Sequence, residues 1–239
     1  MSDVIEFYDN FSSRQARAGI NNRHISILFH LEQLGLKKDH HVLEVGCGIG
    51  TVSELILQSL SPHGTLHAVD ISPKSIDIAK RLISKYKNAT VEVRDLTKEK
   101  INTTFDVIVL PDVLEHIPFD LYTPLFENLN QMLSDDGFIF IHIPHPNYLE
   151  WLIKQGSKEL QIIDNPVYTN KLSSLIYPAG FYIDYLKSYS VYSKSPDYQI
   201  ILLRKKSATL DYTSRTTFFQ MPLSRKVIKK FSYLLRGFK

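Results

Sequence analysis

The chain has 239 residues, of which 44% are hydrophobic and 22% charged, a composition typical of a globular protein with a full core. Its formal net charge of +3 is too small to indicate a nucleic acid or an anionic membrane as partner. A single cysteine, Cys47, excludes an intramolecular disulfide and a thiolate zinc site, and it favours a reducing cytoplasm. No apolar signal segment or bilayer-length run occurs, so neither secretion nor a membrane span is predicted.

Three segments are predicted along the chain. Residues 1–35 form an N-terminal helical extension, in which Asn21 and Asn22 cap a helix that ends at Gly35. Residues 36–206 form one α/β domain, and residues 207–239 form a basic tail.

The α/β pattern begins at residue 41, where short β-branched runs alternate with segments of helical periodicity. This alternation predicts βαβ units and a parallel sheet. Ser72 and Pro73 predict the start of one crossover helix, and an apolar stripe over residues 121–133 predicts another that stops at Gly137. The predicted strands are residues 41–45, 65–70, 90–95, 105–112 and 138–144, followed by an antiparallel edge hairpin of residues 181–192 and 197–204.

A glycine-rich loop follows the first predicted strand. Residues 42–50 read Val-Leu-Glu-Val-Gly-Cys-Gly-Ile-Gly, with three glycines at alternate positions. Glycine permits a positive φ and close approach of a ligand, and the next helix offers free N–H groups to a carboxylate. The spacing is not Gly-x-Gly-x-x-Gly and no Lys-Ser/Thr follows, so a pyrophosphate ligand is disfavoured. A tight turn without a ligand is the alternative, and Glu44 either orders this loop or caps its first turn.

Acidic residues follow the next three strands. Asp70 ends the second strand, where an acid can accept hydrogen bonds from ribose hydroxyls. Asp95 and Asp112 end the third and fourth strands. The carboxyl ends of parallel strands share one edge of a sheet, next to the ligand crevice of such folds. The three acids therefore predict a site for a cationic ligand.

These motifs, in this order, resemble those of the class I (Rossmann-like) S-adenosylmethionine-dependent methyltransferases. The resemblance is carried by residues 42–50, 68–72, 94–96 and 105–117. It implies a seven-stranded, mostly parallel sheet with helices on both faces and an antiparallel C-terminal hairpin. It also implies S-adenosyl-L-methionine as cofactor, with its methionine part on the glycine loop, its ribose at the second strand, its adenine at the third and its sulfonium at the fourth. The implied cofactor-binding residues are Glu44, Gly46, Cys47, Gly48, Gly50, Asp70, Ile71, Asp95, Leu96, Leu110, Pro111 and Asp112.

Methyl transfer to oxygen requires in-line positioning of donor and acceptor, together with a base that removes a proton. Residues 111–116 read Pro-Asp-Val-Leu-Glu-His and are similar to the Glu-x-x-Glu-His stretch of the O-methyltransferases of ubiquinone biosynthesis, some of which bind a divalent ion there. Asp112 replaces the first Glu, so no metal is favoured, although Asp112, Glu115 and His116 are the candidate ligands. In the metal-free alternative Glu115 and His116 orient the loop, and His116 is a candidate catalytic residue.

A second histidine cluster runs off the fifth strand. Alternation places His142 inside the sheet layers, as a hydrogen-bonded core histidine. His145 lies past the strand end and is the first candidate for the general base, with a structural loop histidine as the alternative.

Acceptor binding is assigned to the segments around the sheet edge. Residues 151–171 are too long for a minimal crossover, and the resemblance implies that this insertion and the N-terminal extension cover the acceptor. Tyr148 and Trp151 suit an apolar or sugar-ring face, or else pack beneath the insertion. The predicted acceptor-binding residues are Tyr8, Arg17, Asn147, Tyr148 and Trp151.

The C-terminal tail has no acidic residue from Tyr212 onward. Leu223, Val227, Phe231, Leu234 and Phe238 recur at helical spacing beside a basic face. Residues 221–239 are therefore predicted to contact a membrane surface or a protein partner. The alternative is a helix packed on the domain or on the second copy of a homodimer.

Three functions are compatible with the sequence. The first is a methyltransferase that acts on a small-molecule, lipid-linked or glycan acceptor, with O-methylation favoured. It is expected in the cytoplasm, and at a membrane if the C-terminal tail binds one. The second is an RNA or protein methyltransferase. Nucleic acid is disfavoured because the fourth strand ends in Leu-Pro-Asp-Val and lacks the Asn/Asp-Pro-Pro-Tyr motif of many nucleic-acid amino-methylating relatives. The third is a cofactor-binding scaffold without catalytic activity.

Overall fold

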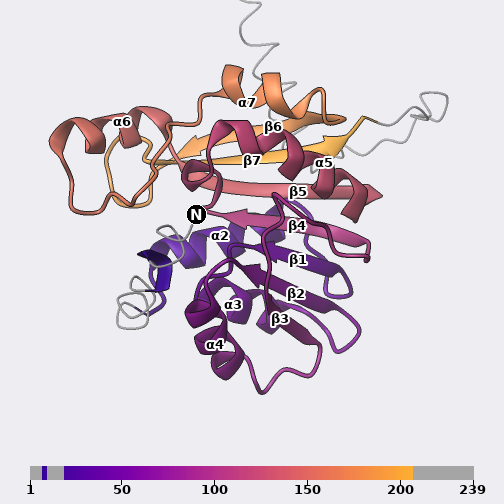
Figure 1. Ribbon diagram of the computed structural model, residues 1–239. Coiled ribbons are helices and arrows are strands. Elements are labelled where there is room, and N and C mark those ends of the chain that lie inside the picture. The colour runs from indigo at the N-terminus through magenta and orange to yellow at the C-terminus, as the bar shows by residue number, and fades with distance from the viewer. Residues whose placement is uncertain (1–6, 10–18, 207–239) are drawn as a thin grey trace, which may run out of the picture. The chain divides into compact units, whose positions relative to one another are not determined.

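The computed structural model describes residues 7–9 and 19–206. Its centre is a seven-stranded sheet in the order β3-β2-β1-β4-β5-β7-β6 (Figure 1). Strand β7 pairs antiparallel with both β5 and β6, whereas the other strand pairs are parallel, which gives the predicted C-terminal hairpin. The strands are β1 (His41–Val45), β2 (Thr65–Asp70), β3 (Ala89–Val93), β4 (Phe105–Pro111), β5 (Leu133–Pro144), β6 (Phe181–Tyr189) and β7 (Tyr198–Lys205).

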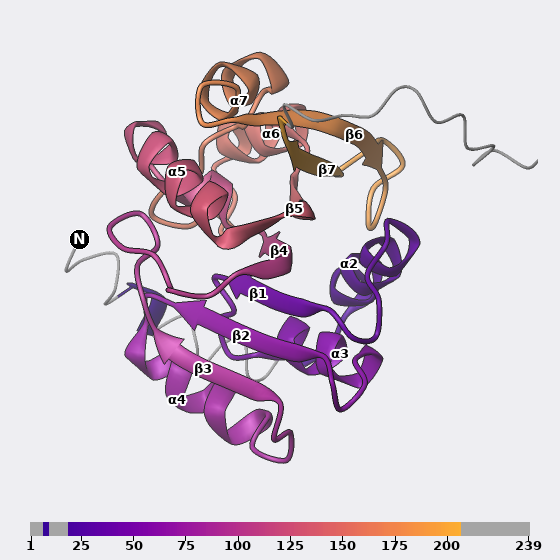
Figure 2. The same cartoon turned by 90° about the vertical axis from the view of Figure 1, so that its right-hand side faces the viewer.

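Helices cover both faces of the sheet. Figure 2 shows α2, α3 and α4 on one face and α5 and α7 on the other. Two buried clusters result, one of which includes Ile27 of α2, while the other includes Tyr122 of α5. The helices are α2 (Asn22–Gln33), α3 (Thr51–Ser59), α4 (Pro73–Leu82), α5 (Tyr122–Met132), α6 (Pro146–Gln155) and α7 (Thr169–Ile176), with short 3₁₀ turns η1 (Leu114–His116) and η2 (Phe119–Leu121).

Strand β4 shows why the central strands read as unbroken apolar runs. Val107 and Val109 belong to the cluster beneath α2, α3 and α4, whereas Ile108 and Leu110 belong to the cluster beneath α5 and α7. Successive side chains of a strand point to opposite faces, and here both faces are buried. The alternation of polar and apolar residues that marks a half-exposed strand is therefore missing from β4.

The order of strands reverses between β1 and β4, because the chain builds outward from β1 to β3 and then returns to the other side of β1. Loops that follow β1 and β4 diverge at this point and leave a crevice at the carboxyl edge of the sheet. The fold therefore brings the glycine loop and Asp112 to the same crevice.

The predicted end of one helix is wrong. Helix α5 ends at Met132 and the chain continues directly into β5, so Gly137 lies inside a strand. A Cβ at Gly137 would lie 2.8 Å from the carbonyl oxygen of Asp106 on β4. The glycine is required for close approach of two backbones, which the sequence pattern does not distinguish from a helix stop.

Helix α2 starts as predicted, since the Asn21 side chain accepts a hydrogen bond from the backbone N–H of His24 at 3.2 Å. Ile27 and Leu31 are buried, whereas Ile25 and Phe29 are exposed.

Candidate functional site

A cavity of about 650 Å³ opens at the carboxyl edge of the sheet, within the size range of small-molecule sites. Its wall begins with the loop between β1 and α3 and continues through the ends of β2 and β4. The remaining wall comes from the start of α2, the segment after β4 and the loop after α6. Residues far apart in the sequence thus share one enclosure.

The glycine loop forms one end of this cavity. Gly46 and Gly48 line it and have positive φ values of 72° and 54°, a conformation that a side chain disfavours. A Cβ at Gly46 would also clash with the side chain of Val113. Gly50 does not line the cavity; a Cβ there would lie 3.1 Å from Ala79, so this glycine permits α3 to approach α4. The contact of Gly50 with the cofactor stays a prediction, beside this packing role.

Two carboxyl groups stand beside the loop. Asp70 accepts hydrogen bonds at 2.8 Å from the backbone N–H groups of Gly48 and Ser72, and burial raises its pKa. Glu44 accepts a hydrogen bond from the Ser53 hydroxyl at 2.5 Å, while burial raises its pKa to about 8. The Glu44 Oε1 atom is buried without a hydrogen-bond partner.

These features fit the amino-acid end of S-adenosylmethionine. The N-terminus of α3 supplies a positive dipole end for a carboxylate, and the unpartnered Glu44 Oε1 atom can accept a hydrogen bond from an ammonium group. Cys47, which also lines the cavity, has a pKa raised well above its ordinary value, chiefly by burial. A neutral, buried thiol is consistent with packing and not with redox sensing.

Next along the wall lie the predicted ribose and adenine positions. Ile71, Asp95 and Leu96 line the cavity. Burial favours a higher pKa for Asp95, but hydrogen bonds from Lys98 and Thr97 outweigh it and lower the pKa. The carboxylate is therefore charged and fixed by its own loop, beside apolar side chains that suit a flat ring.

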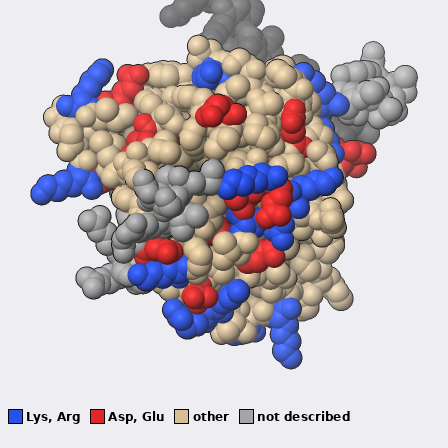
Figure 3. All heavy atoms as spheres, in the orientation of Figure 1, with Lys and Arg blue, Asp and Glu red and all other residues tan. Residues whose placement is uncertain are grey.

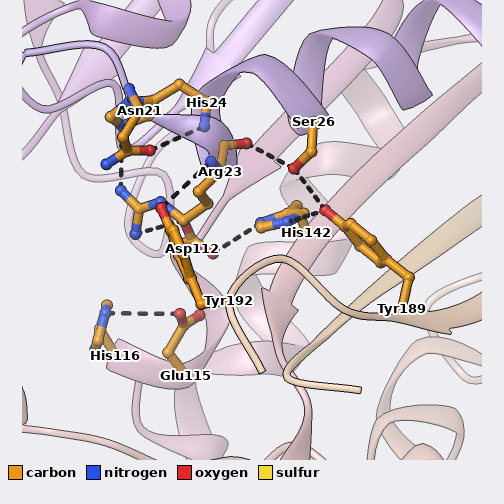
Figure 4. A network of polar contacts seen from close by, with 10 residues as sticks. All are labelled: Asn21, Arg23, His24, Ser26, Asp112, Glu115, His116, His142, Tyr189 and Tyr192. Carbon is orange, nitrogen blue, oxygen red and sulfur yellow. Dashed lines mark hydrogen bonds and ion pairs between the residues drawn. The ribbon is translucent and has the colours of Figure 1, made fainter. Parts of the chain in front are cut away.

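The end of β4 holds the most strongly constrained acid. Asp112 lines the cavity with an unusual positive φ of 55°, and its backbone N–H donates to the His142 carbonyl at 2.7 Å. Its carboxylate contacts Arg23 at 3.0 Å and the His142 Nδ1 atom at 2.8 Å (Figure 4). Burial would raise the Asp112 pKa, but Arg23 and His142 lower it to about 2. Pro111 also lines the cavity, whereas Leu110 is buried in the core and does not.

The candidate metal ligands do not converge. Asp112 points to Arg23 and His142, while Glu115 is buried and absent from the cavity wall. The Glu115 Oε1 and His116 Nε2 atoms are 3.7 Å apart. Burial, followed by Asp112, raises the Glu115 pKa well above its ordinary value. Among the residues that the structure describes, no group of three or more His, Cys, Asp and Glu side chains is arranged to hold a metal ion.

His116 lies on the cavity wall with a defined tautomer. Its Nδ1 atom is 2.8 Å from the Ile163 carbonyl oxygen, which can only accept, so Nδ1 carries the proton. Burial lowers the His116 pKa and keeps the ring neutral at neutral pH. Its Nε2 lone pair is then available to accept a proton.

The other predicted acceptor residues separate into two groups. Tyr8 lines the cavity, and its ring lies 6.4 Å from the His116 ring in an edge arrangement. His145 instead caps α6, its Nδ1 accepting from the Asn147 N–H at 3.3 Å, and it does not line the cavity. Tyr148 and Trp151 stack on each other on α6, outside the lining; Asn147, also on α6, does not line the cavity either, and Arg17 lies outside the described residues.

Several cavity residues escaped sequence reasoning. Asn21, Arg23 and His24 enter from the start of α2, and Gln161 and Ile163 enter from the loop after α6. The one available signal was the predicted cap at Asn21, which places polar side chains at a helix start. Nothing in the sequence indicated which strand edge this helix would face.

Comparisons with known proteins agree with this geometry. Residues 43–139 match a family described as "Methyltransferase domain". A ubiquinone biosynthesis O-methyltransferase of Coxiella burnetii is 30% identical over 159 residues, which are 64% of each chain. A malonyl-[acyl-carrier protein] O-methyltransferase of Ilyobacter polytropus is 29% identical over 132 residues, 55% of this chain and 46% of that protein. The chain thus spans about half to two thirds of the curated relatives it matches.

The solved structures extend the likeness to the fold. A magnesium protoporphyrin IX methyltransferase from Synechocystis, with bound SAH, superposes with a TM-score of 0.59 and is 18% identical in sequence. The match covers 76% of this chain and 81% of that structure's chain. The seven-stranded sheet with its C-terminal hairpin is therefore the class I methyltransferase fold.

Proposed function

We propose that this chain, a class I S-adenosylmethionine-dependent methyltransferase by its domain at residues 43–139, transfers a methyl group from S-adenosyl-L-methionine to an oxygen atom of a small-molecule acceptor. The observation that carries the proposal is the single cavity that joins the glycine loop and Asp70 to the neutral imidazole of His116. A cofactor end and a proton-accepting group thus share one enclosure.

The cofactor is assigned to the half of the cavity nearest α3. Gly46, Cys47 and Gly48, with Glu44 behind them, would hold its methionine part, because the positive φ values and the helix start expose backbone N–H groups. Asp70 and Ile71 would face the ribose, and Asp95 and Leu96 the adenine. Pro111 and Asp112 would lie beside the sulfonium. When bound, the cofactor supplies an electrophilic methyl group.

The base is assigned to His116. Its Nδ1 proton is committed to the Ile163 carbonyl, so Nε2 can take the proton of an acceptor hydroxyl as the new carbon–oxygen bond forms. Tyr8, Arg23 and Gln161 line the same part of the wall and would orient the acceptor. His145 remains the alternative base, but its position as the cap of α6 argues against it.

A small acceptor is favoured by the relatives and by the surface. Two of the curated relatives are named ubiquinone biosynthesis O-methyltransferase and malonyl-[acyl-carrier protein] O-methyltransferase. Figure 3 shows Lys and Arg side chains interspersed with Asp and Glu on this face of the described residues, which does not favour a nucleic-acid surface. No described helix is long and apolar enough to cross a membrane. The tail predicted to bind a membrane or a second copy lies outside the described residues.

The test is to incubate the purified protein with methyl-labelled S-adenosylmethionine and a small-molecule extract of its own cells, and to follow the label by mass spectrometry. A labelled O-methyl product that requires His116 is expected. Label found only in RNA or protein fractions would favour the second hypothesis, whereas cofactor binding without any label transfer would indicate a scaffold.

A further inference from the structure

A chain of four short polar contacts connects the cavity wall to helix α2 (Figure 4). The Asp112 Oδ1 atom lies 2.8 Å from His142 Nδ1, and His142 Nε2 lies 2.8 Å from the Tyr189 hydroxyl. That hydroxyl lies 2.8 Å from the Ser26 hydroxyl, which donates to the Arg23 carbonyl at 2.8 Å. The chain thus links the end of β4 through β5 and β6 to the start of α2.

Counting protons along this chain fixes its protonation. Each of the four contacts needs one hydrogen between its two heavy atoms, because two bare lone pairs at this distance repel. The Tyr189 and Ser26 hydroxyls supply two, and a neutral His142 supplies one. A fourth proton is required. The ion pair of Asp112 with Arg23 at 3.0 Å keeps this carboxyl group ionised, so an imidazolium at His142 provides the proton.

With that fourth proton each donor in the chain has an acceptor. His142 donates from Nδ1 to Asp112 and from Nε2 to Tyr189, Tyr189 donates to Ser26, and Ser26 donates to the Arg23 carbonyl. The Arg23 guanidinium forms an ion pair with the Asp112 carboxylate at 3.0 Å, so both ends of the chain of contacts belong to these two residues. One carboxylate is thereby shared between two cations.

We propose that His142 is a positioning residue of the acceptor site: held as an imidazolium between Asp112 and Tyr189, it locks the start of helix α2 against the cavity. Asn21, Arg23 and His24 then stay in the wall as an ordered surface for the acceptor. The inference rests on the proposed function for its catalytic consequence, but the protonation of His142 can be tested without it.

The groups around His142 are compatible with a charged ring. Asp112 bonds to it directly, and Tyr198 of β7 stacks on it with ring centroids 4.8 Å apart. Burial raises the pKa of Tyr198, and burial lowers that of His24 to about 4, so both are neutral at neutral pH. The titratable and charged groups that face His142 are Asp112 from β4, Arg23, His24 and His30 from α2, Tyr189 from β6 and Tyr198 from β7.

The first test is nuclear magnetic resonance of the full chain labelled with ¹⁵N-histidine. The ring resonances of His142 are assigned as those that are missing from the spectrum of His142→Gln. Both ring nitrogens of His142 are expected to carry protons at pH 7. Tyr189→Phe removes the acceptor for Nε2 without emptying the core, and in this variant the Nε2 resonance should move to the unprotonated range. A neutral His142 in the unmodified protein at pH 7 would overturn the proposal.

The second test measures the attachment of α2. In Tyr189→Phe the amide exchange of α2 should rise roughly fivefold to tenfold, as loss of one net hydrogen bond predicts. Tyr185→Phe, on the same strand but outside the chain, should leave it unchanged. Transfer of labelled methyl by Tyr189→Phe should fall while calorimetric affinity for S-adenosylhomocysteine stays the same. Unchanged α2 exchange in Tyr189→Phe would refute the proposal, whereas failure of the unmodified protein to bind S-adenosylhomocysteine would refute the proposed function alone.

Discussion

The two ends of the cavity are built in different ways. At the end proposed for the cofactor, Gly46, Gly48 and Glu44 come from one short stretch, and Asp70 reaches it from the neighbouring parallel strand. At the end proposed for the acceptor, Arg23 and Asp112 meet across a large separation in sequence. Backbone geometry therefore defines the first end, whereas long-range side-chain contacts define the second. Substitutions should therefore damage cofactor affinity at one end and turnover at the other.

The largest effect is expected at Gly46. In Gly46→Ala the left-handed strain should cost about 1–2 kcal/mol of stability, and the clash with Val113 should shift the loop. Calorimetry should then show S-adenosylhomocysteine affinity reduced on the order of a hundredfold or more. Gly156→Ala is the matched control, because φ is 60° there and no atom lies within 4 Å of the added Cβ. Equal affinity losses in both variants would remove the special role of the loop.

The acceptor end should respond in turnover. His116→Ala should lose on the order of a hundredfold in methyl transfer while cofactor affinity is preserved, because only the base is removed. His145→Ala should retain turnover, since its side chain caps α6 away from the cavity. The comparison requires initial rates with labelled cofactor for both variants. The opposite pattern would transfer the role of base to His145.

A substitution of Asp70 should reduce cofactor affinity less than Gly46→Ala does. Asp70→Asn keeps a side chain of the same size but weakens the hydrogen bonds that Asp70 accepts from Gly48 and Ser72 and those expected from the ribose hydroxyls. The expected loss of cofactor affinity is roughly 1.5–3 kcal/mol, the range for hydrogen bonds to charged groups. Asp77→Asn on the exposed face of α4 serves as control. An Asp70→Asn protein with unchanged affinity would mean that another group holds the ribose.

A separate expected effect, on folding and not on binding, is a pH dependence of stability. The Glu44 pKa is about 8 in the folded chain against an ordinary 4.5, so between these values the folded state holds a proton that the unfolded state releases. Stability should therefore fall as pH rises through this window, by up to about 1.4 kcal/mol per pH unit. Denaturant unfolding of Glu44→Gln should show a flatter pH profile. Parallel profiles for the two proteins would show that Glu44 is ionised inside the fold.

The fold was predictable because its signals are local. β1 and β2 fall where the sequence places them, and Ser72 caps α4 as expected. The prediction that Gly137 ends a helix was wrong, because a glycine after an apolar stripe marks either a helix end or a close contact between two backbones. Period and composition do not separate these two cases.

The site was predictable only where it is local. The glycine loop follows from spacing, whereas the pairing of Arg23 with Asp112 depends on how α2 docks on the sheet. His116 and His145 both follow strands, so the sequence does not show which of them reaches the cavity. In the fold His145 caps α6, whereas His116 lines the cavity. A base is selected by geometry that no local pattern encodes.

Binding of S-adenosylmethionine in this cavity can be measured by isothermal titration calorimetry of the purified full chain. One-to-one binding with micromolar affinity is expected for S-adenosylmethionine and for S-adenosylhomocysteine, and it should be lost in Gly46→Ala. Tight binding of a nicotinamide dinucleotide, with no heat from either sulfur compound, would contradict the proposed cofactor.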